Sequence, residues 1–171
     1  MLNFELKARI SDYEKIIEKM INIGAVHKET MNQIDYYFQI GTEKTKIREI
    51  NNQEIYLISY KRLEQNGRKD SNYIIKTLSR EEKDSLFEKK PLLCSVDKTR
   101  QLWVYKHTRI HIDNVTDLGE FMELETVVKD ISKNQALDEF NEVVSKLGIE
   151  LKKTEAFSYS DLILNKVPSL N

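Results

Sequence analysis

The amino-acid sequence predicts an α+β fold in which an eight-stranded antiparallel sheet forms a barrel with flanking helices. Apolar and polar residues alternate with period two in eight segments, which is typical of strands. Short turn-like stretches separate many of these segments, and this favours antiparallel pairing. Four further segments carry helix signals and are inserted between the strands or follow them. Strands therefore dominate the predicted fold.

Composition limits the class of protein before any motif is considered. The chain has 171 residues, 40% of them apolar, which is enough to bury a core. No linker-like stretch or repeat divides it, so we expect a single domain over residues 1–171. The 27 basic and 28 acidic residues give a net charge of −1, without the basic excess typical of a nucleic-acid-binding protein. We therefore expect no nucleic-acid partner.

The expected location is the cytoplasm. No apolar run approaches the roughly 20 residues that a membrane span needs, so no membrane partner is expected. Charged residues interrupt the apolar positions of the first ten residues, which argues against a signal peptide. Cys94 is the single cysteine, which excludes a disulfide framework and favours a reducing compartment.

The strands are assigned where period-two alternation is clearest. In the first segment, even-numbered residues from Leu2 to Ile10 are apolar and the residues between them are polar. The same reading gives all eight predicted strands: Leu2–Ile10, Gln33–Ile40, Thr45–Ile50, Glu54–Lys61, Asn72–Leu78, Cys94–Tyr105, Thr108–Val115 and Glu120–Val128.

The helices are assigned from their start and stop signals. Ser11 and Glu14 have capping-box spacing, an apolar stripe follows, and Gly24 suits a helix end. Ser79 and Glu82 repeat the capping-box spacing. Two further helices are predicted over Ser132–Gly148, with Leu137, Phe140, Val144 and Leu147 on one face, and over Ser158–Lys166.

Charged side chains recur two residues apart on the predicted strands, so the members of each set point to the same face. A solvated sheet face would explain any one such set. Five sets in one chain favour a different arrangement, with apolar faces outward under the helices and charged faces around a barrel interior. The sets are Glu5, Lys7 and Arg9; Lys46 and Arg48; Lys98 and Arg100; Arg109, His111 and Asp113; and Glu123 and Glu125, while Lys61 ends its strand alone.

Such an interior predicts a phosphate site. Buried charge is costly unless it is paired. Eight cations would face four carboxylates there, so a polyanion would neutralise the excess. Carboxylates among cations suit a divalent metal that bridges to phosphate oxygens. The predicted phosphate-binding residues are Lys7, Arg9, Lys46, Arg48, Lys61, Lys98, Arg100 and Arg109, and the predicted ligands of Mg²⁺ or Mn²⁺ are Glu5, Asp113, Glu123 and Glu125.

The chain resembles the CYTH superfamily of triphosphate tunnel metalloenzymes along nearly its whole length. Residues 3–7 (NFELK) are similar to the family's ExExK signature, and residues 33–38 (QIDYYF) to its Q-x-D-x-Y-F strand. Residues 46–48, 57–61 and 97–100 resemble its R-x-R, L-x-Y-K and K-x-R strands. Residues 113–125 are similar to its D-x-V-x-x-L-G-x-F-x-E-x-E stretch, and residues 158–162 to the S-Y-x-x-L ending of class IV adenylate cyclases.

The resemblance implies a tunnel that binds a triphosphate with one or two divalent metals. Class IV cyclases convert ATP to cyclic AMP and pyrophosphate, and relatives hydrolyse inorganic or thiamine triphosphate. Dimers are common among relatives, so a homodimer is an expectation. Lys7 has two possible roles: a general base for the 3′-hydroxyl, or a phosphate clamp.

Two departures from the family pattern bear on activity. Asn3 stands where ExExK has its first glutamate, and an amide oxygen binds a metal more weakly than a carboxylate. Residues 68–76, the segment nearest to the family's R-x-E-x-E strand, carry no carboxylate in the equivalent strand positions. Three functions follow: a cyclase as the leading interpretation, a triphosphatase, and a weakly catalytic module that binds a nucleotide or polyphosphate.

Overall fold

The computed structural model describes residues 3–40, 43–65 and 68–166. Its strands form one eight-stranded sheet in the order β1-β8-β7-β6-β2-β3-β4-β5, and the five pairings with a defined register are antiparallel. This confirms the predicted α+β fold class. The strands are β1 (Asn3–Arg9), β2 (Val26–Ile40), β3 (Glu43–Ile50), β4 (Glu54–Gln65), β5 (Arg68–Thr77), β6 (Leu92–Tyr105), β7 (Thr108–Val115) and β8 (Gly119–Val127).

The chain divides into two compact units, and each is described by itself. The first contains Met1–Thr30 and Thr99–Ser158, and the second contains Met31–Lys98 and Tyr159–Asn171. Two boundaries fall inside strands, so β2 and β6 each contribute residues to both units. The expectation of a single domain stays a prediction. None of the helices in the described part of the chain is long and apolar enough to cross a membrane.

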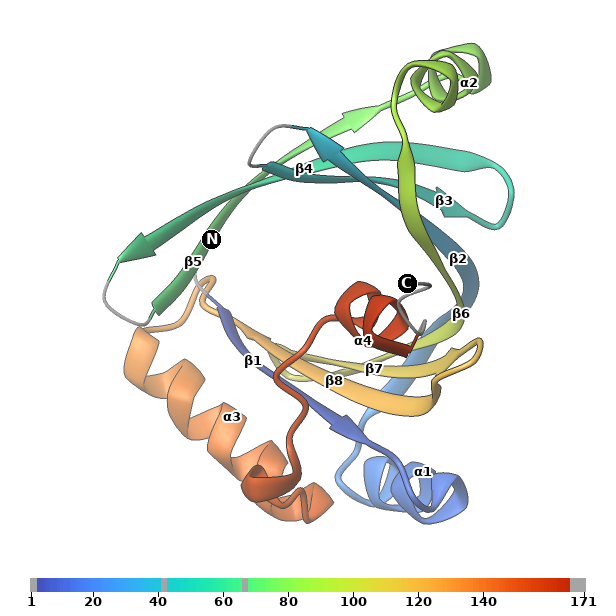
Figure 1. The fold of residues 1–171 in the computed structure, drawn as a ribbon. Helices are drawn as coiled ribbons and strands as arrows, with labels where there is room; N and C mark the ends of the chain where they lie inside the picture. The colour runs from blue at the N-terminus through green and yellow to red at the C-terminus, as the bar shows by residue number, and fades with distance from the viewer. Residues whose placement is uncertain (1–2, 41–42, 66–67, 167–171) are drawn as a thin grey trace. The chain divides into compact units, whose positions relative to one another are not determined.

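The first unit packs two helices against the apolar face of its strands (Figure 1). Helices α1 (Tyr13–Asn22) and α3 (Lys133–Leu147) bury their apolar stripes there. Even-numbered residues of the strands supply the other side of this core, as the period-two pattern predicts. The buried members are Met20, Ala25, Ile110, Ile112, Met122, Leu124, Val143, Val144 and Leu147.

Both helices of the first unit differ in detail from the prediction. The predicted capping box of Ser11 and Glu14 is wrong: Asp12 is the N-cap, and its side chain accepts a hydrogen bond from the Lys15 backbone N–H. In α3, Ser132 and Gln135 form a capping box. Leu137 is 39% exposed, because the buried face of α3 is rotated away from it.

The end of α3 depends on a glycine. Gly148 follows the helix with φ +69, a left-handed conformation that residues with a β-carbon rarely adopt. Lys19 on α1 donates a hydrogen bond to the Leu147 carbonyl at 2.8 Å. A β-carbon at position 148 would lie 2.7 Å from the Lys19 Nζ. The side chain of Lys19 therefore occupies the place next to this helix end.

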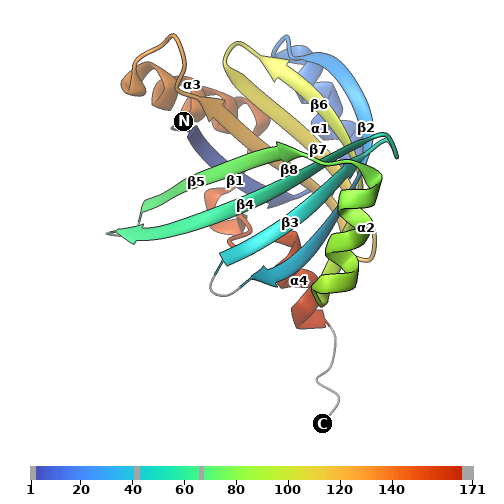
Figure 2. The same cartoon turned by 90° about the horizontal axis from the view of Figure 1, so that it is seen from above.

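The second unit places helix α2 (Arg80–Lys89) against β2, β3 and β4, and Figure 2 shows β3, β4 and β5 side by side with α2 next to them. Ser79 and Glu82 form the predicted capping box. Helix α4 (Tyr159–Lys166) and a short 3₁₀ helix, η1 (Leu151–Lys153), complete the structure. The core under α2 contains Phe38, Ile47, Ile55 and Leu78, with Tyr36, Leu57, Leu86 and Phe87 at its edge.

Strand β2 begins earlier than the predicted Gln33. Its first residues, from Val26 to Thr30, are all exposed, so one face is not distinguished from the other by burial. A strand that is exposed to solvent on both faces shows no period-two alternation of apolar and polar residues. Only the part of β2 from Met31 onward carries that pattern.

Candidate functional site

The first unit carries a charged face opposite its apolar core. Strands β1, β8 and β7 pair in register, so their odd-numbered residues form three rows across the sheet. Apart from Phe121, the members of these rows are side chains that the sequence analysis placed on a charged face. The rows are Glu5, Glu125 and Arg109; Lys7, Glu123 and His111; and Arg9, Phe121 and Asp113.

Arg100 joins two of the predicted metal ligands. Its guanidinium donates two hydrogen bonds to Asp113, from Nε at 2.7 Å and from Nη2 at 2.5 Å, and a third to Glu123 at 2.6 Å. Arg100 and Asp113 are both buried. A two-point contact between a guanidinium and a carboxylate fixes both side chains. Asp113 and Glu123 therefore hold an arginine in this structure.

Lys7 lies between a carboxylate and a backbone carbonyl. Its Nζ is 3.2 Å from Glu123 and donates a hydrogen bond to the Phe157 carbonyl at 3.3 Å. The backbone of β1 also contacts this segment, since the Glu155 N–H donates to the Lys7 carbonyl at 2.7 Å. These contacts hold the side chain on the charged face, where sequence analysis predicts it.

Two carboxylates stand directly opposite one another at one end of this face. Glu5 on β1 pairs with Glu125 on β8, and like charges in that position repel. Desolvation, and then the Glu125 carboxylate, raise the pKa of Glu5 above its ordinary value, although the residue as a whole is exposed. Arg109 contacts Glu125 at 3.4 Å from an exposed position.

Asn3 lies beside this carboxylate pair. Its amide Nδ2 donates a 2.6 Å hydrogen bond to Glu125, and its amide oxygen is buried without a partner in the described part of the chain. Two carboxylates and an unsatisfied amide oxygen are hard oxygen donors of the kind that Mg²⁺ and Mn²⁺ bind. The donor set fits a divalent metal, although the described residues hold no group of three or more His, Cys, Asp or Glu arranged for one.

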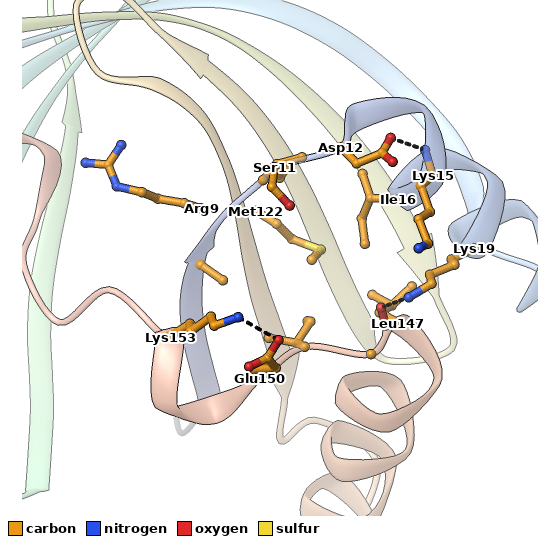
Figure 3. A pocket seen from close by; sticks show the side chains of 14 residues that line it. Arg9, Ser11, Asp12, Lys15, Ile16, Lys19, Met122, Leu147, Glu150 and Lys153 are labelled. Carbon is orange, nitrogen blue, oxygen red and sulfur yellow. Dashed lines mark hydrogen bonds and ion pairs between the residues drawn. The ribbon is translucent and has the colours of Figure 1, made fainter.

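Arg9 has aromatic and backbone contacts. Its guanidinium lies 4.6 Å from the centre of the Phe121 ring and donates to the Leu118 carbonyl at 3.0 Å. Figure 3 shows it turned away from a cavity of about 300 Å³ between β1, α1 and the end of α3. Met122 and Ile16 line that cavity. Since both belong to the apolar side of the unit, the cavity lies apart from the charged face.

The second unit contains a compact cationic cluster, which we define as Lys46, Arg48 and Lys98 around Asp35. Asp35 accepts hydrogen bonds from Lys46 at 2.8 Å and from Arg48 at 2.7 and 2.8 Å. The register of β2 and β3 brings Asp35 opposite Arg48. Although burial opposes it, the nearby cations, led by Lys46, hold the pKa of Asp35 far below its ordinary value.

Aromatic rings support the lysines of this cluster. The Lys46 Nζ is 5.5 Å from the centre of the Tyr37 ring, and the Lys98 Nζ is 5.0 Å from that of Tyr159 on α4. Lys98 is 4% exposed and Lys46 is 6% exposed, so both ammonium groups lie in a largely buried setting. Lys61 belongs to β4, and its side chain lies outside the described residues.

Sequence analysis did not predict the role of Asp35. The signal was present in part: Asp35 is the one acidic residue of the predicted strand Gln33–Ile40, and the next predicted strand carries Lys46 and Arg48. The role of Arg100 as the partner of Asp113 was missed for a related reason, since spacing along a strand reveals a shared face but not which strands are neighbours.

Comparison with known proteins agrees with this arrangement of strands. A candidate adenylate cyclase of Methanocaldococcus jannaschii is 25% identical over 174 residues, covering 95% of this chain and 98% of that protein. A solved Pyrococcus horikoshii structure has a TM-score of 0.80 at 20% identity, covering 94% of this chain and 99% of the other. A Hippeastrum protein, described as a candidate adenylyl cyclase with a dominant triphosphatase activity, has a TM-score of 0.66 at 12% identity and 99% coverage of both chains.

The family model of the CYTH domain matches residues 1–159, which is most of the chain. The match includes the three rows of the first unit and the cationic cluster of the second. The chain belongs to the CYTH family.

Proposed function

We propose that this protein binds the triphosphate of ATP together with Mg²⁺ or Mn²⁺ and converts ATP to cyclic AMP and pyrophosphate. The observation that carries the proposal is the cationic cluster, in which three cations share Asp35 in a largely buried setting. The M. jannaschii relative, a candidate adenylate cyclase, supports the choice of reaction.

The cationic cluster would hold phosphate oxygens. Asp35 orients Lys46 and Arg48 through charge-assisted hydrogen bonds, so these side chains need little reorganisation when an anion arrives. A guanidinium and two ammonium groups can neutralise the charge that gathers on a leaving pyrophosphate. Lys61, from the resemblance, and Arg9 and Arg109, from the spacing of charges along their strands, remain proposed phosphate-binding residues.

The carboxylates of the first unit would hold the metal. Glu5, Glu125 and the Asn3 amide oxygen form the donor set, and a divalent ion there would polarise a phosphoryl oxygen. Arg100 occupies Asp113 and Glu123. Arg100 stays a proposed phosphate-binding residue, and Asp113 and Glu123 stay proposed metal ligands, on the basis of the resemblance.

The reaction is an intramolecular displacement at phosphorus. The 3′-oxygen of ATP attacks the α-phosphorus, the new O–P bond forms, and the bond from the α-phosphorus to the bridging oxygen breaks. The electron pair leaves with pyrophosphate, and the 3′-hydroxyl proton passes to a base. The neutral amine of Lys7 is the proposed acceptor of this proton. As an ammonium, Lys7 would bind phosphate instead, and its contacts with Glu123 and Phe157 suit that second role.

A triphosphatase is the second candidate, favoured by the activity described for the Hippeastrum neighbour. In that reaction water replaces the 3′-hydroxyl as the nucleophile and orthophosphate is released. A binding module with little turnover is the third candidate, favoured by the amide at Asn3 in place of a carboxylate.

Product analysis separates the three. The protein is incubated with Mg²⁺ or Mn²⁺ and with ATP, inorganic triphosphate or thiamine triphosphate, and products are identified by phosphorus NMR and chromatography. Cyclic AMP with pyrophosphate supports the proposal, orthophosphate supports a triphosphatase, and tight binding without turnover supports a binding module. Lys98→Met should abolish turnover, whereas Lys153→Met, a cation of the separate cavity, should not.

A further inference from the structure

The cavity of the first unit is a concave site that the proposed function does not use. It has a volume of about 300 Å³ and lies between β1, α1, the end of α3 and η1 (Figure 3). Ligand sites usually measure roughly 300–1,000 Å³, so this one would hold a small molecule. Every residue that lines it belongs to the first unit.

The buried part of the cavity wall is apolar. Ala8, Met122 and Leu147 line it and are 7%, 3% and 1% exposed. Ile16 and Ile149 also line the cavity and are half-buried. An apolar group that enters the cavity would therefore be removed from water, which is favourable in proportion to the area it buries.

The rest of the wall is polar and open to solvent. Ser11, Lys15 and Glu150 line the cavity and are exposed, so a molecule in solution can reach it from this side. An apolar inner wall with a polar opening fits an amphipathic ligand, whose apolar part lies inside and whose polar group stays near the opening.

Cations exceed carboxylates around the cavity. Glu150 pairs with Lys153 at 2.8 Å, and Asp12 is the N-cap of α1. One positive charge is in excess, which matches a monoanion better than a triphosphate with several charges. The count leaves out Arg9, whose guanidinium is turned away from the cavity (Figure 3), and includes Lys15, Lys19, Lys153, Asp12 and Glu150.

Lys15 occupies an unfavourable position for a cation. It lies in the first turn of α1, where the helix dipole disfavours positive charge, and Lys19 follows one turn later on the same side. The Lys15 ammonium has no ion pair or hydrogen bond in the part of the chain that the structure describes, whereas that of Lys19 donates to the Leu147 carbonyl. Both side chains lead from α1 toward Leu147 (Figure 3). An anion bound by the two ammonium groups would relieve their repulsion.

We propose that this cavity binds a small monocarboxylate with an apolar body. The carboxylate accepts hydrogen bonds from Lys15, Lys19 and the Ser11 hydroxyl, and the apolar body lies against Met122 and Leu147. A carboxylate carries the single charge that the lining lacks, whereas a phosphate monoester carries close to two at neutral pH. The site is separate from both charged faces and does not depend on the proposed function.

Calorimetry on the unaltered protein tests the class of ligand, with octanoate as the probe. We expect one molecule of octanoate to bind per chain, at least about tenfold more tightly than 1-octanol, which lacks the charge. Butanoate should bind at least about tenfold more weakly than octanoate, because it buries fewer methylene groups. Equal affinities for octanoate and 1-octanol, equal affinities for octanoate and butanoate, or no binding of octanoate would overturn the proposal.

Substitution of Lys15 tests the place of binding. Lys15→Met should weaken octanoate binding about tenfold without lowering the Tm, because it removes a cation that has only repulsive neighbours on its helix. Lys28→Met makes the same change of charge at an exposed position of β2 and should leave the affinity unchanged. Equal effects of the two substitutions would overturn the proposal. Displacement of octanoate by inorganic triphosphate would also overturn it, because it would place octanoate on a charged face.

Discussion

In both units, charged side chains two residues apart on strands form the charged face. The two faces differ in their balance of positive and negative charge. In the first unit, four carboxylates and an amide stand among the cations, and two of those carboxylates repel each other across β1 and β8. In the second unit, three cations share Asp35. Strands with period-two alternation can therefore present one surface suited to binding a cation and another suited to binding an anion.

The difference also decides how each face is stabilised. Arg100 has two carboxylates to bind, so the loss of one leaves the other. The cations around Asp35 have that carboxylate in common. Removing a carboxylate that three cations share should cost more stability than removing one of two carboxylates that bind the same arginine.

The largest predicted effect follows from that sensitivity. Asp35→Asn should lower the free energy of unfolding by about 3–5 kcal/mol, the usual cost of removing one member of a buried ion-pair group. Asp113→Asn should cost less, because Arg100 retains Glu123. Urea unfolding at pH 7 measures both. If the two variants lose equal stability, the contrast between the units is wrong.

The stabilisation from Asp35 should depend on pH in a defined direction. Its pKa is lowered in the folded protein, so its contribution is complete above the ordinary aspartate pKa of about 3.9 and is lost as the pH falls below that value. The stability gap between wild type and Asp35→Asn should therefore shrink in acid. A gap that stays constant from pH 7 to pH 3 would contradict the assignment.

The next effect concerns anion binding in the second unit. Lys98→Met removes one buried cation and should weaken triphosphate binding roughly 10- to 100-fold, as expected for a charge-assisted hydrogen bond. Calorimetry with inorganic triphosphate measures it. Lys153→Met removes an exposed cation of the first unit and is the control, with unchanged affinity. An unaltered affinity in Lys98→Met would discard the phosphate assignment.

A smaller effect is expected at the carboxylate pair of the first unit. Asn3→Glu adds a third carboxylate beside Glu5 and Glu125 and should tighten Mn²⁺ binding about tenfold, because affinity for hard cations rises with ligand charge. Calorimetry without nucleotide measures the change. Asn114→Asp adds charge at an exposed position of β7 and controls for net charge. If both variants tighten binding equally, Asn3 is not at a metal position.

The smallest effect is expected at the exposed edge of the same face. Arg109 is 51% exposed on its side chain and contacts Glu125 at 3.4 Å, so solvent and salt screen its charge. Arg109→Gln should weaken triphosphate binding about threefold or less, and the loss should vanish at high salt. Titrations at two ionic strengths test this, and a tenfold loss at high salt would place Arg109 with the buried cations.

Sequence reasoning predicted most of the fold because burial and alternation coincide in most strands. Residues on β1, β7 and β8 alternate between a helix-covered face and a charged face, which is the pattern the sequence carries. At the exposed start of β2, burial and alternation do not coincide, so sequence analysis did not predict that part of the strand. The N-cap moved from Ser11 to Asp12 because both residues have suitable side chains and the sequence does not show which one begins the helix.

The candidate site was predicted as a set of residues but not as a set of contacts. Alternation placed Lys46 and Arg48 on one face, yet their partner Asp35 comes from another strand whose register depends on the whole sheet. The unsatisfied oxygen of Asn3 has no counterpart in any sequence pattern. It emerges only when the neighbours of the amide are known.

Gly148 lies at the end of α3 and lines the cavity of the first unit, so assays of binding at the charged faces do not report on it. Its left-handed backbone disfavours any residue with a β-carbon, and a methyl group there would also displace the Lys19 ammonium from its place beside the helix end. We expect position 148 to vary as little among related sequences as a catalytic residue does, because the backbone conformation there requires glycine. Lineages that keep glycine there are expected to keep the lysine on α1 as well, so the two positions should vary together.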